Sequence, residues 1–228
     1  MTDSATIEIG SKRVPVWPEG HPYKIRGEEV QIVRTDFTDT ADYHPGLIDY
    51  VLNKAAEPVN AKQYGRSMGG TKLYYLDQWD CPETRLLNAR ALSFFYRALN
   101  TDKAAIDIAW VNIYRRGDYI VPHSHTRSLV SLVYVIDLGD VEDAASYSGR
   151  FSFVDPRLPD CCLIEEGRMT NPLMPAMHPG TMLMFPSELV HAVNPYDGER
   201  PRITASWNIN LEAIPGSPLD SFGGEDAG

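Results

Sequence analysis

The sequence predicts an α+β fold that is mainly β, with a jelly-roll core and helices packed on its outside. Three observations support this prediction. The second half of the 228-residue chain contains short runs rich in Val, Ile, Tyr and Trp, separated by turn residues. Gly and Pro occur 17 times each, which is typical of many turns between short strands. The first half contains one long segment with helical periodicity.

The first 104 residues are expected to form a mixed helical and strand region. Residues 1–30 are polar and contain prolines, so we expect irregular structure there. Residues 30–37 alternate as a strand does, and residues 47–56 have the pattern of a short amphipathic helix. Residues 57–71 contain three glycines and indicate a loop.

The clearest helix is expected over residues 82–100. Pro82 suits the first helical position, and Glu83 beside it suits the positive end of the helix. Apolar side chains then recur at helical spacing, at Leu87, Ala91, Phe94, Phe95 and Ala98. An apolar face of this length is expected to cover a sheet.

We expect one domain, in which residues 105–212 form the jelly-roll core and residues 213–228, rich in Pro, Gly and Ser, form a disordered tail. The candidate strands of the core are residues 105–114, 128–137, 150–154, 181–185, 192–194 and 202–211.

The charge of the chain excludes some partners. A formal net charge of −10 and a pI of about 5.0 give an acidic surface that repels phosphate backbones, so no nucleic-acid partner is expected. No apolar run reaches the roughly 18 residues that span a bilayer, and residues 1–4 lack the apolar core of a signal peptide. A cytoplasmic protein without a membrane partner is expected, and its acidic surface mildly favours a small or cationic substrate. The sequence leaves the oligomeric state open.

The three cysteines are Cys81, Cys161 and Cys162. Their odd number, and the adjacency of two of them, argue against a disulfide framework and fit a reducing compartment. We expect free thiols rather than a soft-metal site.

Two of the six histidines form a His-x-His pair, His123 and His125. Residues two apart in a strand point to the same face, so both imidazoles can reach one metal ion. His191, within an apolar segment, is the candidate third ligand that would leave coordination positions open. The alternative is that the pair is hydrogen-bonded on a barrel rim and that His191 is a satisfied core histidine.

The other three histidines are expected to be structural. His21 and His44 each precede a proline in polar segments, so we expect them at the surface. His178-Pro-Gly is typical of a turn before a strand.

The residues around the metal candidates resemble the prolyl 4-hydroxylase-like branch of the iron(II)- and 2-oxoglutarate-dependent oxygenases. In that branch a tyrosine and a glycine, here Tyr114 and Gly117, precede a His-x-Asp motif at the spacing of His123. The resemblance runs from about Trp110 to Leu211. It is greatest to a bacterial and phage group with a His-x-His motif, whose further motifs are matched by Trp110-Val-Asn112, Ser131-Leu-Val-Tyr134, Asp155-Pro156-Arg157 and Phe185-Pro186-Ser187.

This resemblance implies a double-stranded β-helix, Fe(II) and 2-oxoglutarate as cofactors, and ascorbate as an accessory reductant. It implies that His123, His125 and His191 bind iron. It also implies that Arg202, Thr204 and Tyr114 hold the far carboxylate of the cofactor. A guanidinium suits that task because it meets a carboxylate bidentately. Taken alone, Arg202 would be expected to be an exposed residue on an edge strand.

One residue departs from the family pattern. His125 stands where most of the superfamily has Asp or Glu, so three neutral imidazoles leave the metal with its full charge. The imidazole also fills the space that chloride occupies in related halogenases, which disfavours halogenation. Asp137 and Asp155 are alternative carboxylate ligands, but Asp155 precedes a proline and is expected to accept a turn hydrogen bond.

The expected reaction is hydroxylation of a small or amino-acid-like substrate, with decarboxylation of 2-oxoglutarate to succinate. Asn112 and Arg127 are weaker candidates for contact with that substrate, together with the loop of residues 64–71. Two alternatives stay open. One is a three-histidine cupin-type iron dioxygenase that does not use 2-oxoglutarate, and the other is a non-catalytic jelly-roll binding module.

Overall fold

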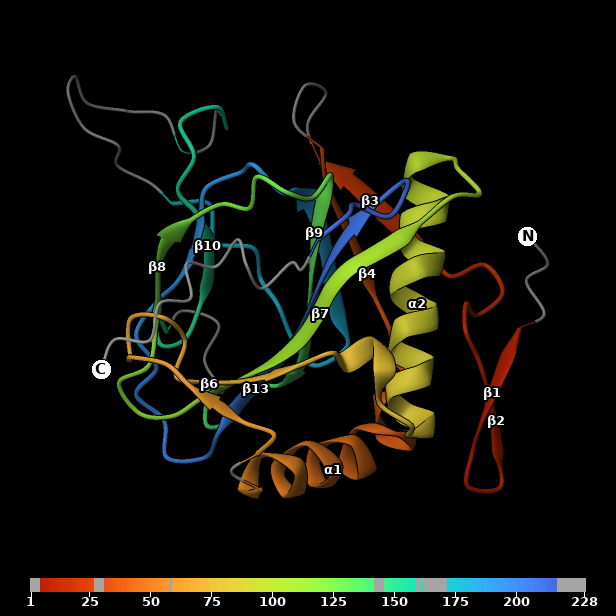
Figure 1. Ribbon diagram of the computed structural model, residues 1–228, viewed down its shortest axis with the longest axis horizontal. Coiled ribbons are helices and arrows are strands. Elements are labelled where there is room, and N and C mark those ends of the chain that lie inside the picture. The colour runs from red at the N-terminus through yellow and green to blue at the C-terminus, as the bar shows by residue number, and fades with distance from the viewer. Residues whose placement is uncertain are drawn as a thin grey trace.

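The computed structural model describes residues 5–26, 31–57, 59–141, 146–158, 161 and 172–216. Two antiparallel sheets face each other, with a small hairpin outside them (Figure 1). The large sheet has the order β3 (Tyr23–Arg26), β4 (Ile32–Asp36), β11 (Thr181–Pro186), β9 (Val130–Asp137), β13 (Arg202–Asn210), β7 (Ala105–Tyr114), β6 (Thr71–Tyr74) and β5 (Lys62–Gln63). The small sheet has the order β10 (Phe151–Phe153), β12 (His191–Val193) and β8 (Ile120–His123).

Two helices cover the outer face of the large sheet, on the side away from the small sheet (Figure 1). They are α1 (His44–Ala56) and α2 (Pro82–Leu99), and the hairpin of β1 (Thr6–Ile9) and β2 (Lys12–Pro15) lies beyond α2 (Figure 1). Short 3₁₀ helices, Thr40–Asp42 and Leu76–Gln78, precede α1 and α2. No helix in the described part of the chain has both the length and the apolar character needed to cross a bilayer.

Helix α2 begins and ends as its sequence predicts. Pro82 occupies the first turn with Glu83, and Asn100 ends the helix in the left-handed conformation, with φ 50° and ψ 49°. Asparagine tolerates this conformation and is common at helix C-termini. The buried face includes Leu87, Phe94 and other predicted apolar residues, but also Arg90, which is 0% exposed.

The large sheet separates two apolar cores. The outer core lies between the sheet and the helices and includes Trp207 and Leu132. The inner core lies between the two sheets and includes Phe151, Phe185 and Val133. Because side chains alternate along a strand, β9 gives Leu132 to one core and Val133 to the other. Strands buried on both faces explain why the sequence shows continuous apolar runs rather than strict alternation.

The strands of the predicted core all form, with bounds shifted by at most a few residues. The expectation of irregular structure in residues 1–30 is wrong, because β1, β2 and β3 lie there. The expected loop of residues 57–71 contains β5 and the start of β6, and the first helix begins at His44 rather than at residue 47. These strands are short, lie at or next to the edge of a sheet, and carry little periodic signal in their sequences. Val30, Cys162 and residues 217–228 of the expected tail lie outside the described residues.

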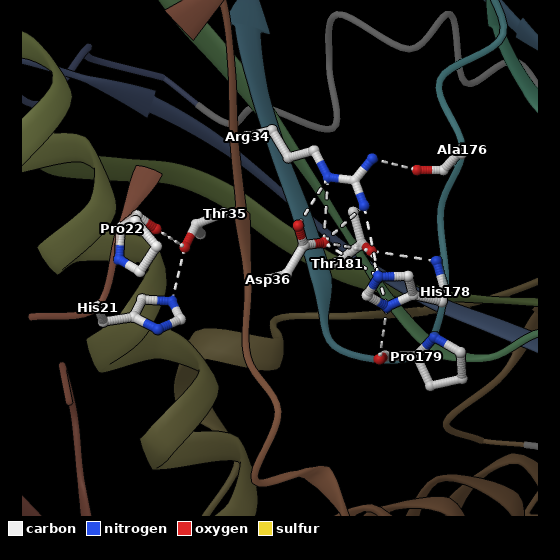
Figure 2. A network of polar contacts seen from close by, with 9 residues as sticks. All are labelled: His21, Pro22, Arg34, Thr35, Asp36, Ala176, His178, Pro179 and Thr181. Atoms are coloured by element: carbon white, nitrogen blue, oxygen red, sulfur yellow. Dashed lines mark hydrogen bonds and ion pairs between the residues drawn. The ribbon is translucent and has the colours of Figure 1, made fainter. Parts of the chain in front are cut away.

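The histidines outside the His-x-His pair have different surroundings. Figure 2 shows His21 and His178 on either side of β4. His21 contacts the Thr35 hydroxyl at 2.6 Å, and His178 lies 3.5 Å from Asp36, which also pairs with Arg34. These contacts tie β4 to its neighbouring segments.

His44 is not at the surface as expected. It is 6% exposed at the start of α1, where its Nε2 lies 2.7 Å from the Tyr134 hydroxyl. The helix places this ring inward, against β9, so the proline that follows His44 marks a helix start rather than a surface turn.

Candidate metal centre and cofactor pocket

Three predicted ligands converge between the two sheets. His123, the last residue of β8, lies directly opposite His191 on β12. His125 follows just after β8 ends, and its backbone N–H donates to the Ser187 carbonyl at 2.8 Å. The candidate ligand atoms of the three histidines all lie within 4.8 Å of one another. The convergence comes from cross-strand pairing and one loop, rather than from a single strand carrying both members of the pair.

Backbone hydrogen bonds fix the tautomers of two of these rings. The Nδ1 atom of His123 lies 2.9 Å from the Val121 carbonyl, and that of His191 lies 2.7 Å from the Leu189 carbonyl. A carbonyl only accepts, so Nδ1 carries the proton in each ring and Nε2 keeps its lone pair. This arrangement orients an imidazole for metal binding.

Burial keeps all three rings neutral. It holds the pKa of His191 well below its usual value and lowers the pKa of His123. Burial, with the charges of His123 and Lys72, lowers the pKa of His125 to about 3. Since a metal competes with protons for these nitrogens, neutral rings at pH 7 are ready to bind one.

The predicted alternative carboxylate ligands lie elsewhere. Among the described residues, the metal-binding group contains only the three histidines. Asp137 accepts the N–H of Gly139. Asp155 is 1% exposed and accepts the Arg157 backbone N–H at 2.9 Å, which is the turn hydrogen bond expected from its position before a proline. It also pairs with the Arg157 guanidinium at 2.7 Å.

Asp155 nevertheless supports the site. Its carboxylate accepts the Val190 N–H at 2.8 Å, and Arg157 donates to the Glu188 carbonyl at 2.7 Å. Together they hold the turn that leads into His191. Hydrogen bonding from Arg157 lowers the pKa of Asp155 to about 2, so this clamp is fully charged at neutral pH. In the sequence, the Asp-Pro-Arg motif indicated that these residues matter, but it did not indicate that they bind the turn before His191.

A cavity of about 200 Å³ adjoins the three histidines. The cavity lies between the inner face of the large sheet and the small sheet, and both contribute lining residues. The lining includes Met68, Lys72, Trp110, Asn112, Tyr114, Ser131, Phe151, Phe185, Arg202, Thr204 and Ser206, besides the histidines.

Arg202 lies at the start of β13, a central strand, and is 2% exposed, so it is not an edge residue. It faces Tyr114 on β7, and its guanidinium carbon is 5.0 Å from the centroid of that ring. Within the described part of the chain, Nε and Nη1 of Arg202 and Oγ1 of Thr204 are buried without a hydrogen-bond partner. Buried polar groups are nearly always bonded, so these donors indicate a site for an anion.

Of the weaker candidates for substrate contact, some line the cavity and one does not. Asn112 lines the cavity, and its Oδ1 accepts the Trp110 indole N–H at 3.1 Å. The loop of residues 64–71 packs against β8, where Val121 donates to Ser67 at 3.0 Å. Arg127 does not line the cavity, because its guanidinium binds both oxygens of Asp107 at 3.0 Å.

Glycine permits the close approach of that loop. Gly70 has φ +67°, and a Cβ atom there would lie 2.2 Å from an oxygen of Asp118. The Asp118 carboxylate also accepts the Arg115 backbone N–H at 2.8 Å, which holds the turn after β7.

Sequence reasoning missed Lys72 as a lining residue and included Met68 only as part of the candidate loop of residues 64–71. Lys72 directly follows the residues expected to form a loop, and a lone lysine in a polar stretch carries no signal of burial. Recognising the short Thr71–Tyr74 strand would have placed Lys72 on one face of a sheet, but not on the face toward the site.

Fold and site together define a class of protein: a double-stranded β-helix with three histidines at one metal position and an anion pocket beside it. Residues 108–208 match the family model described as "Putative 2OG-Fe(II) oxygenase". This match confirms the expected resemblance, and the family implies iron(II) and 2-oxoglutarate as cofactors. Comparison with curated proteins finds no significant match.

Solved structures share the fold at low sequence identity. AviO1 from Streptomyces viridochromogenes Tue57 is 14% identical, with a TM-score of 0.60, over 82% of this chain and 92% of that one. The epimerase SnoN, solved with Fe3+, alpha ketoglutarate and nogalamycin RO, is 12% identical with a TM-score of 0.64, over 86% of each chain. A Pseudomonas putida prolyl-4-hydroxylase is 16% identical with a TM-score of 0.56, over 85% and 95%.

These likenesses confirm the predicted fold class, a double-stranded β-helix with helices outside it. The family match over residues 108–208 supports a 2OG-Fe(II) oxygenase.

Proposed function

We propose that the protein is an iron(II)- and 2-oxoglutarate-dependent dioxygenase that hydroxylates a small molecule. His123, His125 and His191 hold the iron. Bound together, iron(II) and 2-oxoglutarate supply the oxidation of a C–H bond by O₂, with release of the hydroxylated product, succinate and CO₂. The observation on which this proposal rests is that buried donors of Arg202 and Thr204, which have no hydrogen-bond partner among the described residues, line the same cavity as the three imidazoles.

The residues present fit both cofactors. Neutral imidazoles with protonated Nδ1 atoms leave Nε2 of His123 and His191 for a metal. The far carboxylate of 2-oxoglutarate would satisfy the donors of Arg202 and Thr204, with Tyr114 closing that end of the pocket. Phe151 and Phe185 pack against the His191 ring, with centroids 5.6 and 4.9 Å away, and exclude water from that side.

The donor set of three histidines also occurs in cupin-type dioxygenases, so that alternative has an observation in its favour. It assigns no purpose to the Nε and Nη1 donors of the buried Arg202, which have no acceptor in the described part of the chain. Dependence on 2-oxoglutarate separates the two functions.

The test is anaerobic titration of the protein with Fe(II) and then 2-oxoglutarate, followed by the visible charge-transfer band of the chelate and by metal analysis. We expect near-unit metal stoichiometry in the wild type and in His178→Ala, and its loss in His191→Ala. Arg202→Met should weaken 2-oxoglutarate binding by roughly 10- to 100-fold, the value of hydrogen bonds to a charged group. The exposed Arg116 provides the control variant Arg116→Met.

Wild-type protein that takes up no metal would contradict the enzyme function altogether. Metal-loaded wild type that does not bind 2-oxoglutarate would favour the cupin-type alternative, and undiminished binding by Arg202→Met would contradict the role given to Arg202. Succinate measured by mass spectrometry, with a panel of small molecules, then tests hydroxylation itself.

A further inference from the structure

Lys72 is the second cation of the cavity. It lies on β6, near the edge of the large sheet, and its side chain lines the same cavity as the three histidines. Its ammonium nitrogen is 5.4 Å from the centroid of the Tyr64 ring and 6.0 Å from that of Trp110. Within the described part of the chain it has no carboxylate partner. Aromatic rings attract a cation but leave its charge uncompensated.

The cavity differs in charge from the rest of the molecule. The chain has a formal net charge of −10, yet no described residue lining the cavity is Asp or Glu. His125, which stands in place of a carboxylate ligand, removes a further negative charge from the cavity. The two negative charges of 2-oxoglutarate match the two positive charges of iron(II), so the charges of Arg202 and Lys72 remain in excess. An unpaired buried charge is costly, and a bound anion would remove that cost.

The cofactor does not account for Lys72. The cross-strand register places Lys72 opposite Asn112, and Asn112 opposite Thr204. Two strand spacings, roughly 10 Å in all, therefore separate the backbones of β6 and β13. Arg202 lies a further two residues along β13, so Lys72 is displaced from the end of the pocket that suits the far carboxylate.

Burial lowers the pKa of Lys72 to about 8, so the ammonium group still carries its charge at pH 7.

We infer that Lys72 binds a carboxylate of the second substrate, which is therefore a small organic acid. The inference rests on the proposed function, because it assigns the substrate class of that same site. The carboxylate lies at Lys72, and apolar parts of the substrate pack against Met68 and Trp110, which line the same cavity. The cavity of about 200 Å³ restricts the substrate to a small molecule.

The test uses Co(II)-loaded protein saturated with 2-oxoglutarate, titrated in a calorimeter with acetate, butyrate, benzoate and phenylacetate and with the matching primary amides. Each pair has nearly the same shape and differs in charge. The variants are Lys72→Gln, Lys72→Arg and, as a control, Lys62→Gln, which removes the exposed lysine directly opposite on β5. Circular dichroism checks that each variant is folded.

We expect at least one carboxylate to bind the wild type about tenfold or more tightly than its amide. Lys72→Gln should abolish this preference, while Lys72→Arg and Lys62→Gln retain it, and the affinity for 2-oxoglutarate should stay within about twofold. The inference is overturned if no carboxylate binds, if acid and amide bind equally, or if Lys72→Gln keeps the preference. It is also overturned if Lys72→Gln weakens 2-oxoglutarate binding as strongly as probe binding, because Lys72 would then serve the cofactor.

Failure of the proposed function has a different signature. Co(II)-loaded wild type would then not bind 2-oxoglutarate, whereas the acid and amide pairs can still be compared on the metal-loaded protein alone. A carboxylate preference that depends on Lys72 would survive in that case.

Discussion

At the scale of single residues, the site depends on side chains that touch no metal. The turn before His191 is held by Asp155, which binds the Val190 N–H and the Arg157 side chain while it is almost fully buried. The Ser187 hydroxyl on the same turn lies 2.8 Å from that of Ser131. Supporting contacts of this kind fix the orientation of a metal ligand and commonly affect metal affinity.

We predict that Asp155→Asn lowers metal affinity roughly 10- to 100-fold and destabilises the fold by about 1–3 kcal/mol, because an amide cannot accept the same set of donors. Competition with a chelating dye and urea denaturation measure the two effects. Asp140→Asn is the matched control, since Asp140 also binds an arginine, Arg200, and backbone N–H groups, but does not line the cavity of the histidines. Equal loss of metal affinity in both variants would contradict a positioning role for Asp155.

At the scale of elements, a buried polar chain joins both helices to the large sheet. Arg90 of α2 donates to the Tyr43 hydroxyl at 2.8 Å, Tyr43 contacts Tyr134 of β9 at 2.6 Å, and Tyr134 contacts His44 of α1 at 2.7 Å. The direction of donation is consistent throughout if the ring nitrogen of His44 accepts from Tyr134. Asp39 neutralises Arg90 at 2.6 Å. The chain fixes how α1 and α2 lie on the outer face of the sheet that carries the site.

We predict that His44 makes stability depend on pH. Burial lowers the pKa of His44 from 6.5 to about 4, so the unfolded chain binds its proton more tightly than the folded one. The contribution of His44 is therefore complete above pH 6.5 and is lost as the pH falls toward 4, by up to on the order of 3 kcal/mol. Denaturation of metal-free protein at a series of pH values measures it.

The His44→Gln variant cannot titrate there and should lose less stability over that range than the wild type. His178→Gln, at an exposed ring, provides the control. Parallel pH profiles for wild type and His44→Gln would show that protonation of His44 is not coupled to folding.

At the scale of the whole molecule, charge and packing are distributed unequally. The acidic surface favoured a small or cationic substrate, whereas the cavity contains two cations and, among its described lining residues, no acid. The three candidate metal ligands line the cavity between the two sheets, whereas the outer core lies between the helices and the large sheet. The outer face of the large sheet is therefore covered by packed helices, whereas its inner face lines a cavity that ligands can fill.

We predict that the metal raises the melting temperature first, and that 2-oxoglutarate raises it further once the metal is bound. Each ligand at about 100 times its Kd adds roughly 2.7 kcal/mol, because it binds only the folded chain. The increment from 2-oxoglutarate should require the metal, and a chelator should remove both increments while the protein stays folded. Differential scanning fluorimetry measures these shifts. Stabilisation by 2-oxoglutarate without any metal would contradict chelation at the three histidines.

Much of the fold was predictable from the sequence because its signals are local. The long strands β7, β9, β11 and β13 are buried and rich in β-branched and aromatic residues, and α2 has both a periodic face and a recognisable start. The short strands β1, β3, β5 and β6, which lie at or next to the edge of a sheet, were not predictable, because a short strand is defined by its neighbour rather than by its own residues.

The sequence by itself determined the candidate ligands His123, His125 and His191 through their spacing and setting, and it indicated the pocket residues Arg202 and Thr204 through the family resemblance. Only the tertiary structure decided that they meet, because cross-strand pairing brings His191 opposite His123 over 68 residues of chain. It alone placed Lys72 in the same cavity and His44 in the interior. Burial and pairing between distant strands depend on which face of each element turns inward, and a local pattern of residues does not specify that.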